Sequence, residues 1–397
     1  PLSATLSLIG AEGVFLLYSR SQTEGQRLLT CIPAMLLCYW CFGYGAWLCL
    51  ALMLAAGIIA HHQELSALLA AGILLLPATQ YPATTWWSKP DLDREYVLSL
   101  DVEHYFGNIQ KMRKHLETDR QILWVTYYRN LYNATHPSEI NSPVSLSRNL
   151  LAWNQPGTNG LILPVNPSAS FLSILFANEL WFTLGDMTMA EHCAMLSMIF
   201  SPRNSGSRMI KRLAEINLVN GDDEAALKYL RILDKTLLHK SWAEKRIPGQ
   251  QTPRVKEWLE KKRRDIPTQD HLRSGNDAVT SLRNLVASNA GNLRAYEYLL
   301  CYHLLSKDLR SFVEDYVPGK VSSSIFAEAL LIHLARQGNI RAEELIKYQI
   351  PVKIAKEFAD YTRLYEAKDT SLKEKYGKTY WFYYHFATTE PGKESKP

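Results

Sequence analysis

The sequence predicts an all-α protein in which transmembrane helices are followed by a tetratricopeptide-like α-solenoid. Three observations support this fold class. Residues 28–63 contain no Lys, Arg, Asp or Glu, apolar residues recur at three- and four-residue spacing through 92–397, and Gly-Asp or Gly-Asn pairs return between the predicted helices. We therefore place a transmembrane region in residues 1–88 and a tetratricopeptide-like helical-hairpin domain in residues 92–397.

The first region is poor in charge. Its ionised residues are Glu12, Arg20, Glu24, Arg27 and Glu64. Each ionised side chain at the centre of a bilayer costs roughly 2.5–3.5 kcal/mol, so the charge-free stretch is typical of helices in lipid. One helix over residues 28–60 would be about 50 Å long and would exceed the ~30 Å hydrocarbon core, and Gly43 and Gly45 allow a turn between two shorter helices. The predicted spans are 2–18, 28–42, 46–60 and 65–81.

The arginines predict the orientation of these spans. Arg20 and Arg27 lie between the first two spans, and cytoplasmic loops favour Arg and Lys. With four spans, the C-terminal domain lies outside the cytoplasm; with the middle hairpin as one long tilted span, it lies inside. The chain begins at Pro1 within an apolar stretch, so we expect it to be the C-terminal part of a longer multi-pass protein. The lipid bilayer is then a predicted partner.

Residues 207–238 form the clearest predicted hairpin of the second region. Gly221-Asp222 separates two amphipathic segments, because glycine readily ends a helix and aspartate caps the next one. The small Ala226 allows the two helices to approach closely. Gly185-Asp186 lies 36 residues upstream, close to the period of about 34 residues in tetratricopeptide repeats.

The same corner pattern recurs along the chain. Further corners are expected at Gly107-Asn108, Lys307-Asp308 and Gly338-Asn339. Residues 136–168 and 243–277 are rich in proline or charge, and we interpret both as connections within one solenoid.

Two segments resemble a known family. The run Ile210–Gly221, continued in 226–230 and 235–237, and the ending Thr379–Phe386 are similar to a family of uncharacterised bacterial multi-pass membrane proteins, known only as a domain of unknown function. The resemblance implies many N-terminal spans, a C-terminal tetratricopeptide-like domain and a place in the bacterial inner membrane. It implies no catalytic residues.

The inner face of the first helix of each hairpin is the predicted binding surface. Concave faces of helical-repeat proteins hold extended peptides or partner helices. By analogy with tetratricopeptide repeats, two successive repeats present charged and apolar residues on this face. These residues are Leu175, Glu179, Phe182, Arg208, Lys211 and Glu215. The alternative is that segments of the chain itself fill the groove.

Other residues are weaker candidates. Glu12 lies midway along a predicted span, where a carboxylate could relay ions or hydrogen-bond to neighbouring helices. Cys38 and Cys41 form a C-x-x-C pair, but we interpret them as packing residues at the end of a span. The basic run 261–264 could contact lipid phosphates, and we favour its interaction with a helix C-terminus.

The sequence contains no motif for nucleotide binding, a metal or a catalytic nucleophile. P-loop, dinucleotide-binding and G-x-S-x-G patterns are absent, and the six cysteines lack zinc-ligand spacing. No cofactor and no metal site are therefore predicted. A net charge of +5 over 397 residues is too small for a dedicated nucleic-acid binder, so nucleic acid is not an expected partner.

These features favour a membrane-anchored scaffold or binding protein that recognises a protein or peptide partner near the membrane. The alternative is the non-catalytic C-terminal part of a multi-pass membrane glycosyltransferase-like enzyme, with its acidic active-site residues upstream of this chain. A small transporter that uses Glu12 is a third interpretation. We prefer the binding protein because no catalytic residue is apparent, and the enzyme class stays open.

Overall fold

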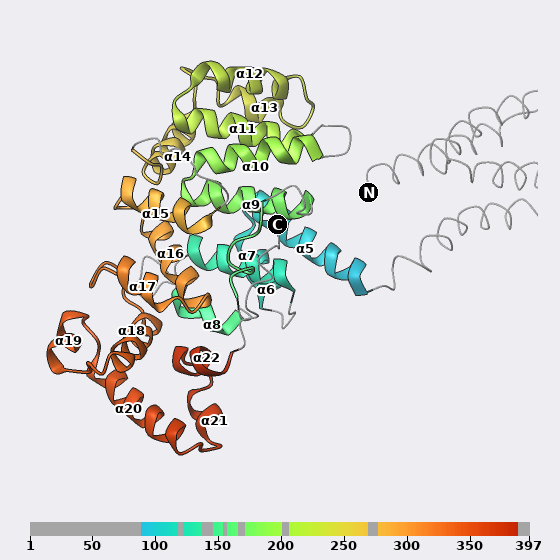
Figure 1. Cartoon of the computed structure of the whole chain (residues 1–397). Coiled ribbons are helices and arrows are strands. Elements are labelled where there is room, and N and C mark those ends of the chain that lie inside the picture. The colour runs from blue at the N-terminus through green and yellow to red at the C-terminus, as the bar shows by residue number, and fades with distance from the viewer. Residues whose placement is uncertain are drawn as a thin grey trace, which may run out of the picture. The chain divides into compact units, whose positions relative to one another are not determined.

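The computed structural model describes residues 89–117, 122–136, 146–153, 157–165, 171–200, 206–268 and 277–387. Every regular element within these ranges is a helix, so the all-α part of the prediction is confirmed for them (Figure 1). Contacts divide the chain into two units, residues 1–94 and residues 95–397. Helix α5 begins in the first unit and continues into the second, which holds all the helices that follow.

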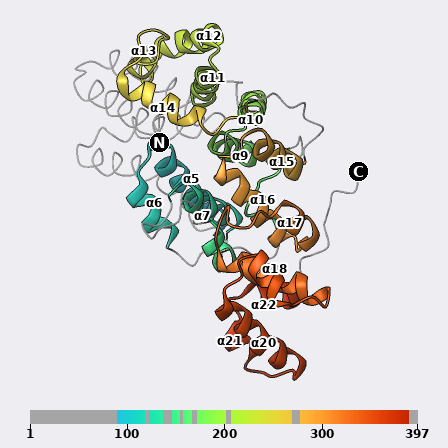
Figure 2. The same ribbon diagram turned by 90° about the vertical axis from the view of Figure 1, so that its left-hand side faces the viewer.

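Short connections link most of these helices. The first are α5 (Lys89–Phe106), α6 (Ile109–Leu116), α7 (Leu123–Thr135), the 3-10 helix η2 (Ser147–Asn149), α8 (Leu150–Trp153), α9 (Phe171–Leu184), α10 (Met187–Phe200), α11 (Ser207–Asn220) and α12 (Asp223–Asp234). The others are α13 (Lys240–Glu244), α14 (Pro253–Arg263), α15 (Ala278–Ser288), α16 (Leu293–Leu305), α17 (Leu309–Asp315), α18 (Ser324–Arg336), α19 (Ala342–Lys347), α20 (Val352–Glu366), α21 (Leu372–Tyr376) and α22 (Tyr380–Phe386). Consecutive helices pack together, and Figures 1 and 2 show α9, α10, α11 and α12 following one another as adjacent layers.

Positive φ angles turn the chain at the predicted corners. Gly185 and Gly221 have φ angles of +92° and +81°, in the left-handed region that glycine enters without steric cost. Asp222 then caps α12, because its side chain accepts a hydrogen bond from the backbone N–H of Ala225 at 2.9 Å. The other predicted corners also have a positive φ at their first residue: Gly107, Lys307 and Gly338. The corner positions read from the sequence are therefore confirmed.

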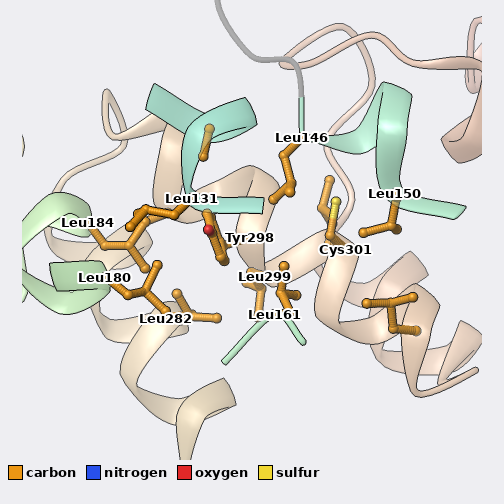
Figure 3. Packing of buried hydrophobic residues seen from close by; sticks show 14 of the residues in the cluster. Leu131, Leu146, Leu150, Leu161, Leu180, Leu184, Leu282, Tyr298, Leu299 and Cys301 are labelled. Atoms are coloured by element: carbon orange, nitrogen blue, oxygen red, sulfur yellow. The ribbon is translucent and has the colours of Figure 1, made fainter. Parts of the chain in front are cut away.

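Helix α16 lies within the hydrophobic core. Figure 3 shows leucines from α7, α9 and α15 gathered around its residues Tyr298 and Leu299. Leu131, Leu180 and Leu282 are fully buried there, and burying each such side chain stabilises the fold by roughly 1.5–3 kcal/mol. The core thus ties α9 to helices that come much later in the sequence.

The aromatic C-terminal segment forms α22 and packs against α18. The indole N–H of Trp381 donates a hydrogen bond to the backbone carbonyl of Glu328 at 3.0 Å. Tyr361 of α20 lies against the same indole, with 5.5 Å between the ring centroids. These aromatic side chains therefore cover the apolar faces of the last described helices.

The structure does not support the predicted transmembrane helices. No helix in the described ranges is both long enough and apolar enough to pass through a bilayer. Such a helix needs about 20 apolar residues, whereas the apolar α9 has 14 residues and the 18-residue α5 carries several acidic and basic residues. The four predicted spans and Glu12 lie outside the described residues. The transmembrane fold class, the membrane localisation and the extracytoplasmic placement of the C-terminal domain are thus corrected: nothing in the described chain supports them.

Replacing Gly185 and Gly221 by alanine should lower the free energy of unfolding by different amounts, because the two glycines have different surroundings. In Gly221→Ala nothing lies within 4 Å of the added carbon, so the left-handed backbone alone opposes the change, at about 1–2 kcal/mol. In Gly185→Ala the added carbon would lie 2.2 Å from the carbonyl oxygen of Asp265, so the backbone must also move. Urea unfolding should show a clearly larger loss for Gly185→Ala. Equal losses would contradict this close approach.

Candidate functional site

A pocket of about 270 Å³ opens between α5, α9, α11 and α14. Its walls combine basic residues, carboxylates, aromatic rings, a histidine and a threonine. They are Arg208, Lys211, Arg212 and Lys262; Glu179 and Glu215; Tyr105, Phe182 and Trp258; His104; and Thr183. Cationic and aromatic side chains therefore share one small concave surface.

Helical periodicity brings many of these side chains together. On α11, Arg208, Lys211, Arg212 and Glu215 follow the three- and four-residue spacing of a single helix face. Glu179 comes from the adjacent helix α9, and tertiary packing adds α5 and α14. The pocket is thus built from two neighbouring hairpins and from two helices before and after them in the sequence.

Glu179 is the buried anchor of the pocket. Its side chain is 5% exposed, and its two oxygens accept hydrogen bonds from Arg208 at 2.8 Å and from Arg212 at 2.5 Å. His104 Nε2 lies 3.5 Å from the same carboxylate. Burial opposes ionisation, but Arg212 and Arg208, together with His104, outweigh it and hold the pKa of the Glu179 carboxyl well below its usual range. Glu179 is therefore negatively charged at neutral pH, and its charge fixes α11 against α9.

Both arginines of the pocket are engaged with carboxylates of the protein. Arg208 Nη2 also donates a hydrogen bond to Asp101 Oδ1 on α5 at 2.8 Å. The same carboxylate accepts a hydrogen bond from the Tyr128 hydroxyl at 2.6 Å. Arg212 Nη1 lies 3.0 Å from Glu215 Oε2. Because the guanidinium groups bind inside the protein, little of their bidentate donor capacity remains for a ligand.

The two lysines of the pocket are placed differently. Lys211 Nζ donates to the Tyr105 hydroxyl at 3.1 Å and lies 4.3 Å from the centroid of that ring. Lys262 Nζ lies 4.5 Å from the centroid of the Phe182 ring. Across the described ranges, neither ammonium group forms an ion pair with a carboxylate. Contacts with aromatic faces stabilise a cation but do not neutralise it, so both charges stay available to an anion.

Lys262 is a cation in an unfavourable place. Its side chain is half-buried, and burial together with the positive charges of Arg212 and Arg294 lowers the pKa of the ammonium group to about 8. Asp265 and Glu215 act in the opposite direction. They offset the effect only in part because each already faces an arginine, as in the Arg294–Asp265 pair at 3.2 Å. An anion bound in the pocket would relieve this cost.

The pocket has a surplus of positive charge. Its four basic residues face the carboxylates of Glu179 and Glu215, and Asp101 lies behind Arg208. With the histidine counted as neutral, four cations against three carboxylates leave one positive charge without a counterpart. The site is therefore suited to an anionic group. Among the residues that the structure describes, no cluster of three or more His, Cys, Asp or Glu could hold a metal ion.

Most of the chain matches a known protein family. The model described as "Family of unknown function (DUF6057)" covers residues 65–387. The chain belongs to this family. The resemblance to a family of unknown function is thus confirmed, while the match carries neither the bacterial multi-pass character nor the tetratricopeptide likeness expected with it. No curated protein and no solved structure matches the chain.

The pocket of this DUF6057 member contains most of the residues predicted for the binding face. Those that line it are Glu179, Phe182, Arg208, Lys211 and Glu215. Leu175 does not line it, because its side chain is 9% exposed and belongs to the hydrophobic core.

Sequence reasoning missed the other charged and aromatic residues of the pocket. They are His104, Tyr105, Arg212, Trp258 and Lys262. Arg212 follows Arg208 by four residues, so helical spacing indicated it. Lys262 belongs to the basic run that we assigned to a helix terminus, and the adjacent Arg263 does donate to backbone carbonyls at the end of α11. Nothing in the local sequence indicated that Lys262 points into a pocket.

Replacing the buried carboxylate should give a pH-dependent loss of stability. Glu179→Gln leaves two arginines without their shared partner, so the free energy of unfolding should fall by about 3 kcal/mol near neutral pH. The folded-state pKa lies below the unfolded value, so the ionic contribution is present above pH 4.5 and is lost as pH falls through the folded-state pKa. Urea unfolding at neutral and acidic pH measures the difference in free energy of unfolding between the wild type and the variant. This difference should become smaller in acid.

The exposed Glu260→Gln on α14 is the matched control for that experiment and should cost little at any pH. A cost of Glu179→Gln that did not change between neutral and acidic pH would contradict the ionic role of Glu179.

Replacing the unfavourable cation should stabilise the fold. Lys262→Met keeps an apolar stem over Phe182 and removes the half-buried charge, so the free energy of unfolding should rise by about 1–2 kcal/mol at neutral pH. The folded-state pKa of about 8 lies below the ordinary lysine pKa of 10.5, so the wild-type protein gains stability as pH rises between these values. The greater stability of the variant relative to the wild type should therefore disappear near pH 10.5. A destabilised variant at neutral pH would show that Lys262 is a structural residue.

Proposed function

We propose that residues 95–397 form a recognition module for a protein or peptide partner, with the pocket as its anchor point. One observation carries this proposal: Lys211 and Lys262 have no carboxylate partner among the described residues, yet they share a small concave surface with three aromatic rings. A half-buried, unpaired cation lowers the stability of the fold, and proteins keep such destabilising residues where binding requires them. Anionic groups are the natural occupants.

The size of the pocket favours one residue of a larger partner over a complete small molecule. Sites for drug-sized ligands usually enclose about 300–1,000 Å³, and this pocket encloses about 270 Å³. On α5, the helix that supplies His104 and Tyr105, Val102 and Phe106 are 48% and 69% exposed. Exposed apolar side chains on the same helix provide contact area for the rest of a partner segment.

We further infer a tetratricopeptide-like arrangement for α9–α12. The corner glycines Gly185 and Gly221 have the same left-handed conformation and lie 36 residues apart. Ala190 and Ala226 occupy equivalent places after these corners, and both are completely buried. On this interpretation the pocket lies on the first helices of two successive repeats, where partner-binding residues were expected.

A peptide selection tests this function. The immobilised full chain is screened with a random peptide library that has free C-termini, and affinities of enriched peptides are then measured by fluorescence polarisation. Lys211→Met and Lys262→Met should each weaken binding about 10-fold or more, because each removes a charge-assisted contact worth roughly 1.5–3 kcal/mol. The matched control Lys228→Met, at an exposed position on α12, should bind as the wild type does.

Two results would contradict the recognition function. One is a selection that enriches no peptide sequence, and the other is a set of enriched peptides that bind the pocket variants and the control equally. Since Lys262→Met is expected to be more stable than the wild type, weaker binding by this variant would not be explained by unfolding.

A further inference from the structure

The pocket also indicates which part of a partner enters it. We propose that the occupant is the C-terminal residue of the partner chain, with its carboxylate at Lys211 and Lys262 and an apolar side chain against Phe182 and Trp258. This inference rests on the recognition function proposed above and adds the chemistry of the ligand.

The charge of the pocket favours a monoanion. After its internal ion pairs are counted, one positive charge is left over, and a single carboxylate neutralises it. Glu179 and Glu215 stand in the same walls, so they repel a second negative charge such as that of a phosphate dianion. The arginine forks that would grip a phosphate are already bound to Glu179 and Asp101.

The cationic and apolar walls adjoin at Phe182. Lys262 Nζ lies over one ring at 4.5 Å from its centroid, and the same ring stacks with Trp258 at 6.3 Å between centroids and an interplanar angle of 25°. An occupant must therefore present a carboxylate and an apolar group close together. The last residue of a chain does so, because both are attached to a single Cα atom.

An internal acidic residue fits less well. Its carboxylate stands at the end of a flexible stem, and the peptide groups on both sides of it would have to lose water at the pocket mouth. A terminal residue brings only one peptide N–H into the pocket. Glu215, which is half-buried in the wall, offers an acceptor for that N–H.

Matched peptides test this inference with the full chain. Fluorescein-labelled Gly-Ser-Gly-Ser-Leu and Gly-Ser-Gly-Ser-Phe are each prepared as the free acid and as the C-terminal amide, and Gly-Ser-Asp-Ser-Gly amide supplies an internal carboxylate. The free acids should bind at least about 10-fold tighter than the amides, which is about 1.4 kcal/mol. Lys211→Met and Lys262→Met should each reduce this difference, and Lys228→Met should preserve it.

The dependence on pH gives a second readout. The charged groups that face Lys262 are Arg212 and Glu215 of α11, Arg294 of α16 and Asp265 after α14. A carboxylate binds the protonated lysine, so the affinity of the free acids should fall as pH rises above about 8. In Lys262→Met this fall should be absent.

The possible outcomes separate the two proposals. Peptides that need both lysines but bind equally as acid and amide would overturn the terminal-carboxylate inference and leave the recognition function intact. The same holds if the internal aspartate peptide matches the free acids, or if inorganic phosphate competes better than N-acetyl-leucine. Free acids that show no binding at about 1 mM would also overturn the inference, whereas the recognition function fails only if the library selection yields no pocket-dependent peptide.

Discussion

The buried carboxylate of Glu179 is the constraint on which the pocket depends. A charge in the interior is tolerated only when opposite charges and hydrogen bonds satisfy it. Arg208 and Arg212 from α11 supply them, and Arg208 extends the network to Asp101 on α5. This one anion therefore sets the positions of three helices relative to each other. It also occupies the arginine donors, which is why the proposed ligand contacts are assigned to the lysines.

The pocket combines a stabilising ion-pair network with a destabilising cation. The Glu179 network stabilises the packing of α5, α9 and α11, whereas the half-buried ammonium group of Lys262 opposes folding because burial and neighbouring arginines disfavour its charge. A residue with a purely structural role would be expected to stabilise the folded state. A destabilising cation beside a well-satisfied ion pair is the physical reason for proposing a recognition role for this pocket.

Features set by residues close together in the sequence were predictable, whereas features set by tertiary packing were not. The corners at Gly185 and Gly221 were predictable because a left-handed glycine and a capping aspartate act over a few residues. The analogy with tetratricopeptide repeats led to a predicted binding face on α9 and α11, and five of its six residues line the pocket. Leu175 lies in the hydrophobic core and not in the pocket wall because α9 is buried on nearly all sides, which an amphipathic pattern does not reveal. Lys262 reaches the pocket only through packing of α14, and the charge-free stretch before residue 89 led to transmembrane helices that no described helix supports.

A double-mutant cycle between Glu179→Gln and Arg212→Met measures the central interaction most directly. Free energies of unfolding for the wild type, the two single variants and the double variant give the coupling energy between these side chains. We expect a coupling of about 1–3 kcal/mol at neutral pH, because each single variant leaves a buried charge poorly compensated. Losses that add within about 0.5 kcal/mol would contradict it, since the buried carboxylate would then not organise the pocket.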